Sequence, residues 1–146
     1  DVFNCDVISL NPNPNVANCA AYALLQVGDP AAIPALAAVI SDPCRAELLR
    51  IAAVDVLGDF AGSPQAVVTL VNTVMNDLGE LNATQLCTIL QRNEVTKPHA
   101  LLGVHALDAL ARGDSTLLPS NLDEAMSPAL RLQLKRVLKA IGDYKR

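Results

Sequence analysis

The chain of 146 residues has no tryptophan, and phenylalanine and tyrosine together make up only 3% of it. It therefore lacks the aromatic platform on which nucleic-acid bases stack, and its net charge of −4 disfavours contact with phosphates. We predict no nucleic-acid binding. Because Asp, Pro, Gln or Arg interrupts every apolar stretch, no run reaches the roughly 18 residues that a membrane-spanning helix needs, so we predict no membrane insertion.

Motifs for catalysis are missing as well. No serine lies in a G-x-S-x-G turn, and there is no glycine-rich phosphate loop. Of the two histidines, His99 and His105, the second lies one helical turn from Asp108, but no third residue is spaced to complete a metal site, so we interpret His105 and Asp108 as a structural pair. Glu47 and Asp55 are interpreted as surface carboxylates. The sequence predicts no enzyme, metal or cofactor.

The four cysteines include no C-x-x-C pair and no neighbouring histidine, which argues against a zinc site. An even number suits two disulfides in an oxidising compartment, and buried free thiols are the alternative. We predict a Cys5–Cys19 bond, which would fasten the start of the chain to the first helix, and a Cys44–Cys87 bond. An extracellular or periplasmic location depends on these bonds, with the cytoplasm as alternative. Since the chain begins at Asp1, we expect a processed or excised form.

What the chain does contain is small and branched apolar residues in helical periodicity. Hydrophobic residues make up 51% of it, mainly Ala, Leu, Val and Ile. They recur at i, i+3, i+4 and i+7, as in Leu49, Ala52, Ala53 and Val56. Residues 1–15, rich in Asn and Pro, lack this period and are predicted to form an irregular leader. Residues 16–146 are predicted to form one all-α domain.

Short sequence motifs repeat along this domain. Gly-Asp recurs at residues 28, 58, 113 and 142, each time after an apolar helical stretch. The segment 28–42 also aligns with 62–76 at an offset of 34, and parts of it recur at an offset of 85. Proline follows several of these breaks, as expected in the first turn of the next helix. Together these registers predict stacked helix pairs.

The segment Val27–Leu36, followed by Asp42 and Arg45–Gly58, resembles the HEAT-like repeat of the phycobilisome-lyase type. The resemblance is strong over 16–78, fair over 98–143 and weak between, where a short extra helix at about 82–92 breaks the count. It departs from the pattern at Arg112, where an apolar residue is expected. The resemblance implies a right-handed α-solenoid of about three to four helix pairs.

The same resemblance implies a non-catalytic scaffold that presents a helical surface to a protein partner. One alternative is a structural subunit that assembles head-to-tail with other copies into an oligomer or filament. The other is a lyase or enzyme accessory subunit. Fold alone does not choose between these functions.

Basic residues gather at the C-terminal end, where residues 129–146 carry six bases and one acid, whereas residues 1–44 carry four acids and no base. Arg131, Lys135 and Lys139 form a ridge at i, i+4 and i+8, with Arg136 beside it. We interpret this basic ridge first as the solvated face of a terminal capping helix. It is also the candidate surface for an acidic protein partner, including the acidic end of another copy.

One short motif has two interpretations. Asn82-Ala83-Thr84 fits the N-glycosylation acceptor pattern, which requires a eukaryotic secreted context. Asn82 equally fits the N-cap of a helix, because its side chain can accept a hydrogen bond from the first turn. We favour the cap.

Overall fold

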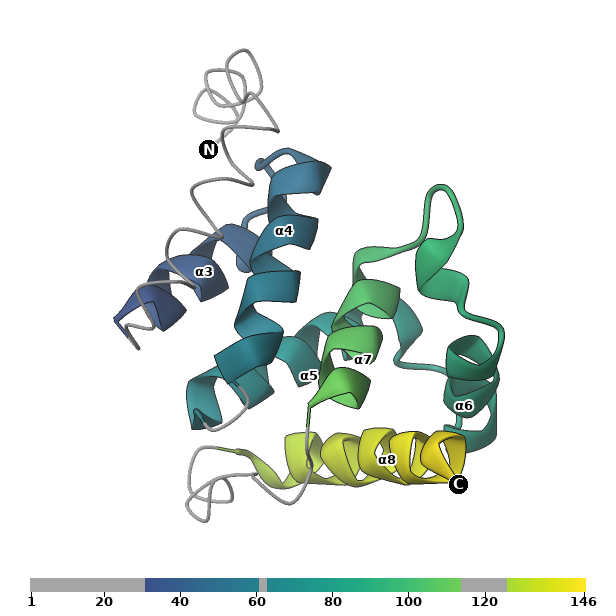
Figure 1. Ribbon diagram of the computed structural model, residues 1–146. Coiled ribbons are helices and arrows are strands. Elements are labelled where there is room, and N and C mark those ends of the chain that lie inside the picture. The colour runs from purple at the N-terminus through teal and green to yellow at the C-terminus, as the bar shows by residue number, and fades with distance from the viewer. Residues whose placement is uncertain (1–30, 61–62, 114–125) are drawn as a thin grey trace.

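The computed structural model describes residues 31–60, 63–113 and 126–146. Within these ranges the chain forms six α-helices, two 3-10 turns and no strand, which confirms the all-α class (Figure 1). The helices are α3 (Ala32–Ser41), α4 (Glu47–Leu57), α5 (Pro64–Leu78), α6 (Ala83–Gln91), α7 (Leu102–Arg112) and α8 (Pro128–Lys145). The 3-10 turns are Gly58–Phe60 and Glu94–Thr96. None of these helices combines the length and apolar character required to cross a membrane.

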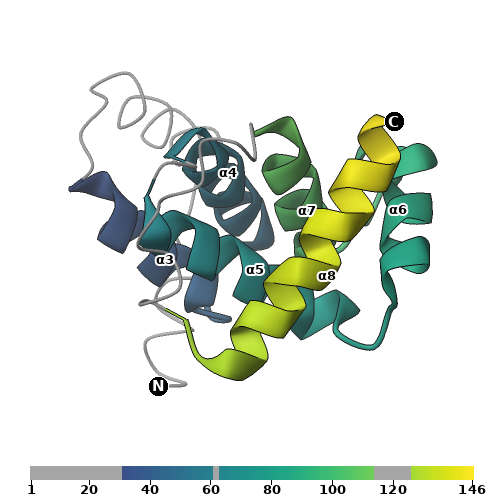
Figure 2. The ribbon, with the colours of Figure 1, turned by 90° about the horizontal axis from the view of Figure 1, so that it is seen from below.

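The helices stack as three pairs in two layers. α3 pairs with α4, α5 with α7, and α8 with α6. One layer runs α3, α5, α8, and the other runs α4, α7, α6, as Figure 2 shows. A continuous apolar core lies between the layers, with a smaller cluster where the start of α8 meets α5. Each helix buries an apolar stripe against its neighbours, as in a solenoid.

The extra helix predicted near residues 82–92 is present as α6, and its position explains why the repeat count breaks there. α6 follows α5 in the sequence but packs against α8 at the end of the stack. α7 then returns to pack against α5. The last two described pairs are therefore interleaved in sequence rather than consecutive.

The repeat register of 34 residues is confirmed by burial. Ile33 and Leu36 of α3 align with Val67 and Leu70 of α5, and all four side chains are buried. α3 and α5 occupy neighbouring places in the same layer. Equivalent sequence positions thus perform the same packing role in successive pairs.

Several helix ends lie where glycine and proline predicted them. Pro64 and Pro128 stand in the first turns of α5 and α8, and the Ser127 hydroxyl accepts a hydrogen bond from Leu130 N at 3.2 Å. The Gly-Asp at 142 was expected to follow a helix, but α8 continues through Gly142 to Lys145. Apart from the backbone of α8 itself, no atom of the described residues lies within 4 Å of the place a Cβ would occupy at Gly142.

The N-cap interpretation of Asn82 is confirmed. Its side chain accepts a hydrogen bond from Gln85 N at 2.9 Å, and the Gln85 side chain accepts one from Asn82 N at 2.9 Å. This reciprocal capping box satisfies two main-chain donors at the start of α6. Glycosylation at Asn82 stays a prediction.

The predicted Cys44–Cys87 disulfide is wrong. Cys87 is a free thiol on the buried face of α6, next to Leu86 in the core. Cys44 lies in the turn between α3 and α4, two helix pairs away. The sequence spacing could not show that α6 joins the far end of the stack. The predicted Cys5–Cys19 bond and the leader 1–15 lie outside the described residues.

Candidate functional site

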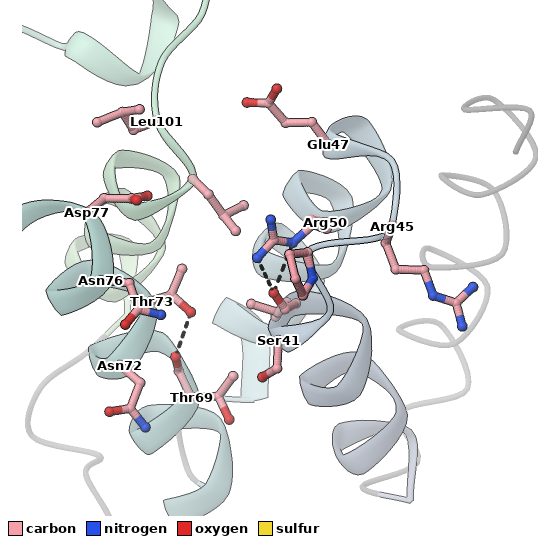
Figure 3. Close-up of a pocket in the computed structure, with 13 residues that line it drawn as sticks. Ser41, Arg45, Glu47, Arg50, Thr69, Asn72, Thr73, Asn76, Asp77 and Leu101 are labelled. Carbon is pink, nitrogen blue, oxygen red and sulfur yellow. Dashed lines mark hydrogen bonds between the residues drawn. The ribbon is translucent and has the colours of Figure 1, made fainter. Parts of the chain in front are cut away.

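A cleft of about 490 Å³ lies between the first and second described pairs, at the end where α3 turns into α4 (Figure 3). Four segments form its walls, namely the end of α3 with the α3–α4 turn, the start of α4, the part of α5 from Thr69 to Asp77, and the start of α7 with Leu101 before it. The lining residues are Ile40, Ser41, Pro43, Arg45, Glu47, Arg50, Thr69, Asn72, Thr73, Asn76, Asp77, Leu101 and Leu102. The volume is within the range of ligand-binding clefts.

Arg50 fixes the wall formed by the α3–α4 turn. Its Nε and Nη2 donate to the carbonyl oxygen of Ile40 at 3.0 and 2.7 Å. This carbonyl belongs to the last turn of α3, where main-chain acceptors have no helical partner. Arg45 pairs with Asp42 at 3.4 Å, and Figure 3 shows its guanidinium pointing away from the cleft. Of the two arginines, only Arg50 faces the cleft.

The opposite wall is one polar face of α5. The hydroxyls of Thr69 and Thr73 each donate to the carbonyl oxygen four residues earlier, both at 2.8 Å. Asn72 and Asn76 lie one turn apart and are exposed. Neither amide has a hydrogen-bond partner among the residues that the structure describes. Two side-chain amides are therefore available to a ligand along this helix.

The start of α7 closes the cleft and adds its apolar part. Asp77 Oδ2 accepts a hydrogen bond from Gly103 N at 2.7 Å, which caps α7 from α5. A Cβ at Gly103 would lie 2.8 Å from the Cβ of Asp77, so this approach requires glycine. Leu101 is 51% exposed at the mouth, and Leu102 beside it is half-buried. An apolar group of a ligand can rest here.

Few charges of the cleft are left for a ligand. Its charged lining residues are Arg45, Arg50, Glu47 and Asp77, and of these Arg45 pairs with Asp42 and points away from the cleft. Arg50 and Asp77 are already bound to main-chain atoms. No histidine or cysteine is among its lining residues, and the described part of the chain brings together no group of three side chains able to hold a metal. The cleft is thus equipped to bind neutral polar groups.

The remaining acidic and basic candidates meet on α4 and α7, outside the cleft. Arg112 donates from Nε to Asp108 Oδ2 at 3.1 Å and from Nη2 to Asp55 Oδ1 at 3.4 Å. This explains the departure from the repeat pattern, because Arg112 bridges the two helices. Asp108 therefore pairs with Arg112, whereas we expected His105. Burial raises the pKa of Asp55, although the neighbouring Arg112 charge opposes this.

The basic ridge is less free than the sequence suggested. Arg136 Nη1 donates to the carbonyl oxygens of Gly79 and Leu81 at 2.9 and 3.3 Å. It therefore ties α8 to the α5–α6 connection. Lys139 pairs with Asp143 at 3.3 Å. Within the described ranges, Arg131 and Lys135 form no ion pair, and Arg131 is half-buried, so Lys135 carries the exposed and unpaired charge of the ridge.

The cleft could not be recognised in the sequence, where Glu47 was interpreted as a surface carboxylate and Asn72 and Asn76 were not singled out. In the register of 34, Asn72 stands where the previous repeat has Ala38, and Asn76 stands where it has Asp42. A polar amide on a helix in place of alanine was the available signal. It was weak, because a single exposed asparagine is common on any helix surface.

Comparison with known proteins supports the repeat architecture. The family model for HEAT repeats matches residues 5–91, which is more than half of the chain. No curated protein and no solved structure gives a significant match. The described helix pairs and this match lead to one conclusion: the chain belongs to the HEAT repeat family and folds as an α-solenoid.

Proposed function

We propose that the protein is a non-catalytic scaffold that binds a protein partner in the cleft between its first two described helix pairs. HEAT repeats are typically protein-interaction modules. The observation that supports the proposal is the pair of amides, Asn72 and Asn76, which have no hydrogen-bond partner among the described residues and line a cleft of about 490 Å³ with an exposed Leu101 at its mouth. Polar groups that orient a ligand beside an apolar contact are typical of binding sites.

Site-specific photo-crosslinking tests this proposal. A photoreactive phenylalanine replaces Asn76 in the full chain, which is then exposed to extract of the source organism. The control carries the same group at Gln91, an exposed residue of α6 outside the cleft. We expect a covalent protein adduct from position 76 only. Equal adducts at both positions, or none at position 76, would contradict binding in the cleft.

Two further proposals rest on the sequence alone. The phycobilisome-lyase subtype and an accessory role beside a lyase depend on the sequence resemblance. An exported location depends on disulfide formation. Since Cys87 is buried and free, we propose that Cys44 pairs with Cys5 or Cys19, in place of the predicted Cys5–Cys19 bond. Such a bond would connect the beginning of the chain to the turn that borders the cleft.

A further inference from the structure

We propose that the cleft binds an extended, uncharged peptide segment that lies along α5 and is held by its main chain. This inference rests on the proposed function and specifies its ligand. The observation behind it is that Asn72 and Asn76 lie along the α5 wall of the cleft, across from the wall that the α3–α4 turn forms, with Leu101 at the mouth (Figure 3).

The spacing of the amides matches an extended chain. Asn72 and Asn76 are four residues apart on α5, and a helix rises about 1.5 Å per residue, so they are separated by about 6 Å along the axis. An extended peptide repeats every two residues, at about 6.6 Å. The two asparagines can therefore reach every second peptide group of one segment. A helical ligand would present free main-chain groups only at its two ends, because the groups in between are satisfied internally.

The chemistry of the amides matches as well. A side-chain amide carries an acceptor and two donors, and each peptide group carries one acceptor and one donor. Asn72 and Asn76 can thus each pair with both polar atoms of a peptide group. The Thr69 hydroxyl has already donated its proton to the Gln65 carbonyl, which leaves it an acceptor for a third contact in the same row.

Charge and apolar contact define the ligand further. Arg50 and Asp77 are bound to main-chain atoms of the protein itself, and Arg45 pairs with Asp42 and points away from the cleft, so Glu47 is the one lining charge left for a ligand among the described residues. A strongly charged segment would lose its hydration without gaining a matching charge. Leu101, exposed at 51%, offers a contact for one apolar side chain of the segment.

The test begins with random linear peptides displayed on phage and selected on the full chain. The double variant Asn72→Leu/Asn76→Leu serves for counter-selection, and Gln65→Leu is the matched control. Gln65 is an exposed amide of the same helix that does not line the cleft. Because all three residues are exposed, these variants should keep the unfolding midpoint of the wild type, which circular dichroism checks.

The winning peptide is then synthesised with a single N-methyl group at each main-chain amide in turn. We expect an affinity loss of about tenfold, equivalent to about 1.4 kcal/mol, at amides two residues apart, and a much smaller loss at the amide between them. The double variant should lose binding, and the Gln65→Leu control should keep it.

Two other results would overturn the inference in different ways. Cleft-dependent peptides that bind as helices, or that lack the alternation, would overturn the main-chain mode and leave protein binding in the cleft intact. If no selected peptide depends on Asn72 and Asn76, both this inference and the proposed function are overturned.

Discussion

Two glycines in this protein should respond in opposite ways to substitution by alanine, because one has open space around it and the other is tightly packed. At Gly142 a Cβ would meet nothing within 4 Å, and the residue lies inside α8. We expect Gly142→Ala to raise the free energy of unfolding by about 0.5–1 kcal/mol, because alanine loses less conformational entropy in a helix. Urea denaturation measures the change.

Gly103 provides the contrast for this experiment. A Cβ there would lie 2.8 Å from the Asp77 Cβ and 3.1 Å from the Thr73 carbonyl oxygen. Gly103→Ala should therefore lower the free energy of unfolding, despite the same gain in helix propensity. If both alanine variants changed stability in the same direction, the close approach of α5 and α7 at this point would be contradicted.

The Asp55 carboxyl makes stability depend on pH. Burial raises its pKa in the folded state, so the folded chain binds more protons than the unfolded chain in the acid range. The contribution of Asp55 to stability is therefore largest at low pH and declines as pH rises through its usual pKa and above it. We expect the unfolding free energy of the wild type, relative to Asp55→Asn, to fall over this range in urea titrations at several pH values. A rise would show that the Arg112 pair outweighs desolvation.

The cysteines can be assigned by chemistry on intact protein. We expect alkylation of the unfolded, unreduced chain to label two cysteines, of which one is Cys87. Peptide mapping should then find Cys44 in the single disulfide, together with Cys5 or Cys19. Labelling of all four thiols would remove the argument for an exported protein.

At the scale of elements, Arg136 and Lys135 are neighbours on α8 with different functions. Arg136 binds the carbonyl oxygens of Gly79 and Leu81, whereas Lys135 is exposed and forms no ion pair with any described residue. We expect Arg136→Ala to lower the free energy of unfolding by about 1–3 kcal/mol, because two acceptors lose a charged donor. Lys135→Ala should change it by less than about 0.5 kcal/mol. Equal effects in urea denaturation would contradict the tie between α8 and the α5–α6 connection.

The helical period of the apolar residues and the positions of glycine and proline predicted the helices well, since both are local properties of the sequence. The stripe through Ala52, Ala53 and Val56 is buried, and α6 begins at its predicted cap, Asn82. Local pattern shows which face of a helix is apolar but not which helix covers it. The interleaved pairing of α5 with α7 therefore could not be predicted. The error over Cys87 has the same origin.

The candidate site was beyond prediction for a related reason. Its walls come from four segments, and Arg50, Asn76 and Leu101 are each ordinary surface residues in the sequence. Only the stacking of the first two pairs brings them together. Arg136 is the opposite case. The sequence predicted it on an exposed ridge, but it binds main-chain atoms of the protein.

At the scale of the whole molecule, the α8 face completes the described stack. Besides Lys135 it exposes Leu132, at 66%, and Lys139, which pairs with Asp143. We expect Lys135→Glu/Lys139→Glu to leave the sedimentation coefficient unchanged, as for the polar end of a capped solenoid. A shift that depends on salt would instead support contact with an acidic partner or with another copy.

The interleaving of the last two pairs also limits how this array can evolve. A solenoid with consecutive pairs gains or loses a unit when a segment of pair length is duplicated or deleted. Here α6 lies in sequence between the members of one pair, and α7 lies between the members of the other. Any such deletion within residues 63–146 would remove one helix from each of two pairs and leave two apolar faces bare. The deletion of a single pair length is therefore expected to destabilise the stack when it falls within this segment.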